Sequence, residues 1–222
     1  MKKMLCAILA ATFLLGCGAV AASAETAGDY TYTIQNSGAV ITGYRGSASS
    51  VTVPNTVNGT PVTAIGSDAF RACLTLNSVS LPGSVTVIGS GAFMGCTTLR
   101  TVSFGGGITS IGDYAFSGCS SLASVTFPGS LTSIGYAAFE GCNSLINAVI
   151  PNSVTAIGDN AFHNCKLVIL FANPDSYAKT YANANGLKFV QKSHAWWLSS
   201  VPIFIQQITR IFFFGWLWVP WL

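Results

Sequence analysis

Cysteine recurs in this chain at one fixed interval, and a thiol can act as a nucleophile, a metal ligand or half of a disulfide. Five cysteines are spaced 23 residues apart, and a phenylalanine precedes each of them by three residues. No insertion breaks the count. The cysteines are Cys73, Cys96, Cys119, Cys142 and Cys165, and the phenylalanines are Phe70, Phe93, Phe116, Phe139 and Phe162.

The spacing leaves three uses of these cysteines open. Disulfides between successive units are allowed by distance, but an odd number of thiols cannot all pair, and side chains stacked in register run parallel. A zinc site takes cysteines roughly two to four residues apart, which these long gaps do not offer. The pattern therefore favours small buried thiols that fill the core, and it predicts no metal site.

Other groups that could do chemistry are sparse. The chain has two histidines, His163 and His194, and neither forms a convincing Ser-His-Asp or Cys-His set. The acids are scattered along the repeats, so the spacing implies no close carboxylate pair. The glycine run between Phe104 and Gly112 lacks the Lys-Ser/Thr ending of a phosphate-binding loop. We therefore expect no enzyme, no catalytic residues and no cofactor.

Self-similarity at this period is typical of a solenoid, in which each repeat forms one coil. Within a coil, an apolar alternation such as Val102 and Phe104 predicts a short strand, which a proline or Gly105 then ends. A repeated glycine predicts a second bend, with either φ > 0 or a close backbone approach. These glycines are Gly66, Gly89, Gly112, Gly135 and Gly158. The residue after most of these glycines is polar and can cap a helix, which predicts a one-turn α- or 3₁₀-helix that carries the Ala-Phe pair. The predicted N-cap residues are Ser67, Ser90, Asp113 and Asp159.

Stacked coils place equivalent residues in ladders, because neighbouring strands lie ~4.8 Å apart. Burying five phenylalanine rings at ~1.5–3 kcal/mol each contributes on the order of 10 kcal/mol, as much as the net stability of a whole domain. The phenylalanine and cysteine ladders are therefore predicted to be the core of the protein.

The opposite side of the predicted strands is uncharged and rich in hydroxyl groups. If Val79 and Leu81 point inward, the two-residue period of a strand places their neighbours on the other, concave face. Such a face suits hydrogen bonding to a ligand, and it equally suits a strand that only has to stay soluble. The candidate ligand-binding residues are Ser78, Ser80, Thr101, Ser103, Ser124 and Thr126.

The segment from Leu122 to Cys142, LASVTFPGSLTSIGYAAFEGC, resembles the BspA-type leucine-rich repeat of bacterial cell-surface proteins. The resemblance implies an α/β leucine-rich-repeat solenoid of 23-residue coils, made of short strands and one-turn helices. It further implies an N-terminal hairpin cap over residues 25–50, repeats over 51–170 and a C-terminal cap of helix and strand over 171–190.

The same resemblance implies an extracellular recognition or adhesion protein whose partner is a protein or glycan at a cell surface. It carries over no catalytic residue. The alternative is a structural spacer or assembly component whose tryptophan-rich tail associates with a membrane or a partner.

Residues 1–24 have the pattern of a secretory signal peptide, with Lys2 and Lys3, an apolar run and a small-residue cleavage site ending at Ala24. The sequence LLGC, ending at Cys17, also resembles a bacterial lipobox, in which Cys17 would be lipidated. Both interpretations predict a protein that is secreted, at the cell surface or membrane-associated.

The exported part of the chain is close to neutral. Between Glu25 and Val190 six basic residues stand against seven acidic ones, which gives a net charge of −1, whereas the whole chain carries +3. Because nucleic-acid binding needs a basic stripe or patch, we expect no nucleic-acid partner.

The composition changes in residues 191–222. From Ala195 onward the tail holds all five tryptophans and one charged residue, Arg210. The uncharged runs on either side of Arg210 are shorter than the ~20 residues that span a bilayer. We predict that residues 195–222 lie on or anchor to a membrane, with a true span and self-association as alternatives.

Overall fold

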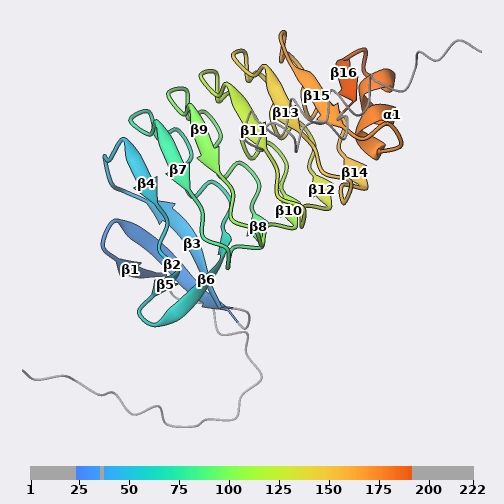
Figure 1. Ribbon diagram of the computed structural model, residues 1–222. Coiled ribbons are helices and arrows are strands. Elements are labelled where there is room, and N and C mark those ends of the chain that lie inside the picture. The colour runs from blue at the N-terminus through green and yellow to red at the C-terminus, as the bar shows by residue number, and fades with distance from the viewer. Residues whose placement is uncertain (1–23, 36–37, 192–222) are drawn as a thin grey trace, which may run out of the picture.

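The computed structural model describes residues 24–35 and 38–191. Figure 1 shows the coils stacked side by side, from β4 near the N-terminal end to β15, β16 and α1 at the other end. Each regular coil contributes one short strand to each of two rows, and strands in a row pair in parallel. The described chain is therefore a solenoid of ~23-residue coils.

The first row continues from an N-terminal hairpin into one nine-stranded sheet, in which Ile88, Ile111 and Ile134 occupy equivalent positions. Its strands are β1 (Glu25–Ala27), β2 (Tyr30–Gln35), β3 (Gly38–Tyr44), β5 (Thr56–Val57), β6 (Thr60–Ile65), β8 (Val87–Ile88), β10 (Ser110–Ile111), β12 (Ser133–Ile134) and β14 (Ala156–Ile157).

The second row is divided into a three-stranded and a four-stranded sheet. The strands of the first are β4 (Ser50–Thr52), β7 (Ser78–Ser80) and β9 (Thr101–Ser103). Those of the second are β11 (Ser124–Thr126), β13 (Asn147–Val149), β15 (Ile169–Ala172) and β16 (Lys188–Gln191). The division falls where Phe104 and Phe127 follow successive strands, with ring centroids 5.5 Å apart.

The predicted one-turn helices are wrong, because this part of each coil is a series of hydrogen-bonded turns. In the second regular coil, for example, the N–H groups of Ala92, Met94 and Cys96 donate to carbonyls three residues earlier. The second residue after each repeated glycine is left-handed, which a right-handed helix does not accommodate. These residues are Asp68 (φ 56°), Gly91 (63°), Tyr114 (56°), Ala137 (48°) and Asn160 (58°). Ser67, Ser90, Asp113 and Asp159 therefore cap no helix.

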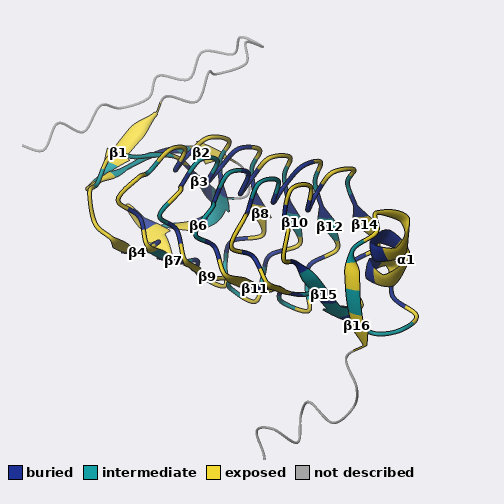
Figure 2. Cartoon of the chain, turned by 90° about the horizontal axis from the view of Figure 1, so that it is seen from above, coloured by how far each residue is buried: buried dark blue, intermediate teal, exposed yellow. Residues whose placement is uncertain are grey.

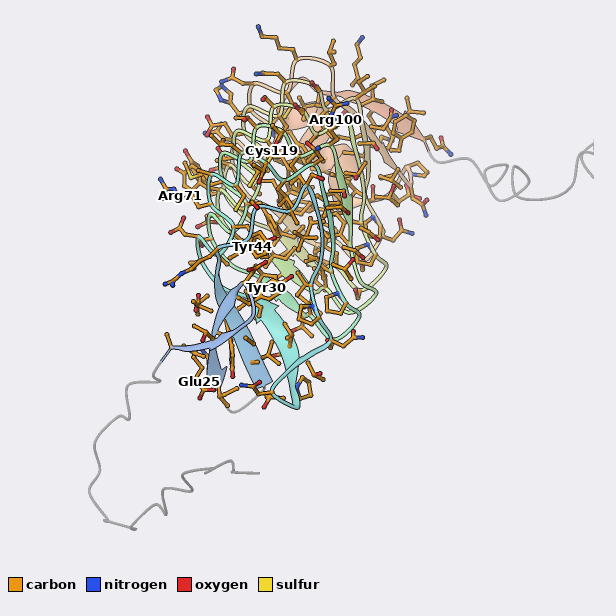
Figure 3. The ribbon with its side chains drawn as sticks, turned by 90° about the vertical axis from the view of Figure 1, so that its left-hand side faces the viewer. Glu25, Tyr30, Tyr44, Arg71, Arg100 and Cys119 are labelled. Carbon is orange, nitrogen blue, oxygen red and sulfur yellow. The ribbon has the colours of Figure 1, made fainter. Side chains whose placement is uncertain are left out.

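The described part of the chain contains a single helix, α1 (Tyr177–Ala184), which lies beside the last coil. It buries Ala178, Tyr181 and Ala182 and exposes its other side, as Figure 2 shows. The Tyr181 ring meets the edge of Phe162 with the centroids 6.2 Å apart. At the opposite end of the solenoid, Tyr30 and Tyr44 lie together over the first coil (Figure 3).

The five phenylalanines form one continuous stack inside the coils. All of them are almost inaccessible to solvent, with exposed fractions of 0–1%. Successive rings lie 4.9, 5.1, 5.1 and 5.4 Å apart between centroids, with interplanar angles of 15° or less. Tyr44 extends the stack at its N-terminal end, 5.1 Å from Phe70. The repeat period thus sets the ring spacing close to the strand spacing.

The repeated glycines allow successive coils to approach closely, and none of them has a positive φ. A Cβ atom on Gly112 would lie 2.8 Å from the Ser90 nitrogen and 2.9 Å from the Gly89 carbonyl carbon. A side chain here would therefore collide with backbone that cannot rotate away.

Candidate functional site

The cysteine ladder lies in the core. All five thiols are free, four are buried, and Cys73 at the start of the ladder is half-buried. Each of the four buried thiols donates a hydrogen bond to the carbonyl of a phenylalanine in the preceding coil, with Sγ···O distances of 3.0–3.3 Å. Within the described residues no group of His, Cys, Asp or Glu could hold a metal ion.

Burial opposes ionisation of the thiols in the middle of the ladder. It raises the pKa of Cys96 to about 12 and that of Cys119 still further, because the thiolate would lie in an apolar interior. Since the thiolate is the reactive form of cysteine, these two thiols are poor nucleophiles. The buried thiols thus occupy the core, as the repeat spacing predicted, and the candidate binding groups lie on the surface.

The outer face of the second strand row carries the hydroxyl groups singled out from the sequence. Val79 and Val125 are buried while their neighbours point outward. Parallel pairing brings Ser78 beside Thr101 and Ser80 beside Ser103. The outward residues of the two sheets, which we name the polar sheet face, are Ser50, Thr52, Ser78, Ser80, Thr101, Ser103, Ser124, Thr126 and Asn147.

This polar sheet face is uncharged, and it holds few internal hydrogen bonds between side chains. Ser78 donates to Ser50 over 2.8 Å, whereas Thr101, Ser103, Ser124 and Thr126 are exposed. Beyond Asn147 the outward positions are mostly apolar: Val149 pairs with Phe171, and Phe171 with Val190. The exception is Lys188, an exposed charged residue that pairs with Ile169. The row thus presents a long hydroxyl surface that ends in aliphatic and aromatic residues and one lysine.

The sequence interpretation missed a second ladder on the other strand row. Threonine recurs there at the 23-residue period, and each hydroxyl after the first donates to the carbonyl of the threonine one coil earlier. These O···O distances run from 2.9 to 3.5 Å. The ladder consists of Thr63, Thr86, Thr109, Thr132 and Thr155, whose regular recurrence was a usable signal.

The turns around the Ala-Phe pairs carry aromatic and charged groups that do not recur. Tyr114 and Tyr136 are exposed and meet edge to face, with ring centroids 5.3 Å apart. Asn160 donates to the Tyr136 hydroxyl over 3.2 Å, and His163 lies 3.2 Å from Glu140. Because each of these residues occurs in one coil only, the repeat pattern gave no signal for the cluster.

Several sequence predictions fall outside the described residues. They concern Cys17 and the signal peptide in residues 1–23, and the tail in residues 192–222, including His194 and Arg210. Within residues 24–35 and 38–191, no helix has the length and hydrophobicity to cross a bilayer.

The comparisons with known proteins address the repeat directly. The model of the BspA-type leucine-rich repeat region matches residues 44–184 in six copies. The chain belongs to the BspA-type leucine-rich repeat family. A search of curated proteins found no relative.

Solved structures agree with this family assignment. The leucine-rich repeat protein TpLRR of T. pallidum is 39% identical, with a TM-score of 0.64 over 67% of this chain and 71% of that chain. A leucine-rich repeat protein from Bacteroides ovatus is 32% identical, with a TM-score of 0.60 over 66% of this chain and 40% of that chain. The pneumococcal vaccine antigen PcpA, 19% identical with a TM-score of 0.51, shares the fold.

Proposed function

We propose that this protein is an exported, non-enzymatic recognition protein that binds a protein or glycan at a cell surface through its polar sheet face. The observation that carries the proposal is the run of exposed, uncharged hydroxyl groups along β9 and β11, close to the apolar outward residues Val149, Phe171 and Val190 of β13, β15 and β16. Hydroxyls supply donors and acceptors for a polar ligand, and the apolar end supplies area that a ligand can bury.

The proposed location rests on the signal-peptide pattern of residues 1–24 and on the surface character of the family that the repeats resemble. A recognition role is favoured over catalysis because four of the five recurring thiols are buried in the core. The near-neutral body argues against a nucleic-acid partner.

The solenoid ends support the same proposal, because binding proteins of this architecture need covered ends to stay soluble. We propose that the hairpin of β2 and β3 caps one end and that α1 with β16 caps the other. Tyr44 stacked on Phe70 and Tyr181 against Phe162 support these roles.

Two lysines on the polar sheet face should abolish binding without loss of stability. Ser103→Lys with Thr126→Lys replaces two exposed hydroxyls by long charged side chains. We expect at least a tenfold loss of affinity for a partner found by screening the full chain against arrays of extracellular proteins and glycans. The thermal midpoint should stay within about 2 °C, since exposed substitutions change stability little.

The matched control adds the same charge to the other strand row. Val87→Lys with Ala156→Lys alters two exposed positions there and should leave affinity unchanged. Equal loss in both double variants would indicate a non-specific charge effect. Full affinity in the Ser103→Lys, Thr126→Lys variant would exclude the polar sheet face.

The alternative function is a structural spacer whose tryptophan-rich tail makes the interaction. A chain lacking residues 195–222 separates the two functions. A recognition solenoid should still capture its partner without the tail, whereas a spacer should capture nothing.

A further inference from the structure

Two exposed tyrosines on the Ala-Phe turns form an aromatic pair outside the polar sheet face. Tyr114 of the third regular coil and Tyr136 of the fourth meet edge to face, with ring centroids 5.3 Å apart and an interplanar angle of 71°. Their exposed fractions are 38% and 41%. Aromatic side chains are enriched at protein interfaces, because each offers a large apolar area together with a polar group. The pair is therefore a candidate contact surface.

Hydrogen bonds between the coils hold this pair in place. The Tyr136 N–H donates to the Asp113 carboxylate at 2.7 Å, and the Tyr114 N–H donates to the Tyr136 carbonyl at 2.9 Å. The Asn160 side chain donates to the Tyr136 hydroxyl at 3.2 Å. Binding to side chains that are already ordered costs less conformational entropy than binding to mobile ones. The pair is thus preorganised for a partner.

Three carboxylates flank the pair. Asp113 and Asp159 lie at the repeat position of Tyr136 in the coils before and after it, and Glu140 follows Tyr136 on its own turn. Desolvation, the neighbouring Tyr136 and the charges of Glu140 and Asp113 raise the pKa of Tyr114, which indicates that both carboxylates lie near this ring. We name Asp113, Tyr114, Tyr136, Glu140 and Asp159 the acidic aromatic patch.

No lysine or arginine offsets these charges in the surrounding sequence. Residues 101–165 contain neither residue type, and their three acids are Asp113, Glu140 and Asp159. The His163 ring lies 3.2 Å from Glu140. Even when this ring is protonated, three negative charges and one positive charge leave a net charge of −2. The patch is therefore complementary to a cationic partner and repels an anionic one.

The negative charge is confined to three successive coils. On the C-terminal side, Asn160 and His163 line a pocket of about 310 Å³ between the last coil and α1, where Lys166 ends the acidic stretch. On the N-terminal side, the turn of the second regular coil has no acid, since Gly91 and Met94 hold the equivalent positions. Two coil spacings of ~4.8 Å make a span of about 10 Å, the length of about three residues of an extended chain. This span fits a short peptide segment.

We propose that the acidic aromatic patch binds an arginine-rich segment of a partner protein. The planar guanidinium group stacks on aromatic rings and also donates paired hydrogen bonds to carboxylates, so it suits both components of the patch. The ammonium group of lysine supplies the charge without the stacking. The patch lies on the turns and is separate from the polar sheet face on the strands, so either proposal can fail without the other.

The test is an NMR titration of the isotope-labelled full chain with three peptides: acetyl-tetraarginine amide, acetyl-tetralysine amide and the neutral isostere acetyl-tetracitrulline amide. We expect the ring protons of Tyr114 and Tyr136 to shift with the arginine peptide and not with the citrulline peptide. The lysine peptide should bind at least twofold more weakly. No shift with the arginine peptide, or equal shifts with the citrulline peptide, overturns the proposal. Equal affinity for the lysine peptide overturns the assignment to arginine.

Variants of the patch give a second readout. Tyr136→Leu keeps an apolar side chain without the aromatic ring and should weaken binding of the arginine peptide about threefold. Glu140→Gln with Asp159→Asn should weaken it about fivefold at low ionic strength. The matched control, Asp29→Asn with Asp175→Asn, removes two exposed carboxylates outside the patch and should leave the affinity within about twofold. An equal loss in both double variants would mean that the peptide responds only to net charge, which contradicts the proposal.

Discussion

Replacing Phe116 with alanine is expected to lower the free energy of unfolding by about 3–5 kcal/mol. The ring is fully buried and lies 5.1 Å from both Phe93 and Phe139, measured between centroids. The edge of Phe104 also packs against it. Its removal leaves a cavity in the middle of the stack that the closely spaced coils cannot collapse to fill. Urea or guanidinium denaturation of the full chain measures the change.

Tyr114→Ala is the matched control, because it removes an aromatic ring from the same coil at an exposed position. We expect a loss below about 1 kcal/mol. A Phe116→Ala loss as small as that of Tyr114→Ala would mean that the phenylalanine stack does not stabilise the protein.

Replacing Gly112 with alanine is expected to cost about 1–3 kcal/mol or more, although it adds only one methyl group. The new Cβ would fall within 2.8–3.1 Å of backbone atoms of the preceding coil. Relief requires the two coils to separate, which would weaken the hydrogen bond from the Gly112 N–H to the Ile88 carbonyl, now 2.8 Å long. The same denaturation experiment detects the effect.

Gly106→Ala provides the comparison in the same coil. Nothing lies within 4 Å of a Cβ atom built on Gly106, and its φ is not in the left-handed region. Alanine there should be neutral or slightly stabilising, since it reduces the entropy of the unfolded chain. If both variants were equally stable, close packing of the coils at Gly112 would be disproved.

The sequence predicted the features that the period determines. Coils of constant length bring Phe93 beside Phe116 and Cys96 beside Cys119, so one regular spacing was enough to place both ladders in the core. The same period predicted the solenoid, and the family resemblance identified it as the leucine-rich-repeat type. The Thr86 and Thr109 positions obey the same logic, and their recurrence at the 23-residue period was a usable signal that the sequence interpretation overlooked.

The local geometry of the turns could not be predicted in the same way. A glycine followed by a capping residue is also the signature of a helix start, and the left-handed conformation of non-glycine residues such as Tyr114 and Ala137 is rare. Contacts between neighbouring coils stabilise it, since the Tyr114 N–H donates to the Tyr136 carbonyl at 2.9 Å. Tertiary hydrogen bonds thus override the local preference.

The candidate sites differ in how much of each could be predicted from the sequence. The outward positions Ser103 and Thr126 follow from the two-residue period of a strand, so their exposure was predictable while their ligand was not. The tyrosines of the acidic aromatic patch each stand at a repeat position that is not aromatic in any other coil, so the period gave no signal for them. The pocket near Lys166 lies where the regular repeat stops and α1 lies beside the last coil. Two of its lining residues, Asn160 and Asn164, differ from their counterparts in earlier coils because α1, and not another coil, lies beyond them.

The central claim is that coils of equal length stack in register, so that each donates the same hydrogen bonds to the next until the last. Native-state amide hydrogen exchange tests this claim most directly, residue by residue. The N–H groups of Phe93, Phe116 and Phe139 donate to the following coil at 2.7–2.8 Å and should exchange only on global unfolding. Those of Asn160 and Asn164 should exchange many orders of magnitude faster. Exchange of the Phe116 amide as fast as that of Asn164 would contradict the stacking of the coils in register. It would also contradict the polar sheet face, whose residues are aligned by that stacking.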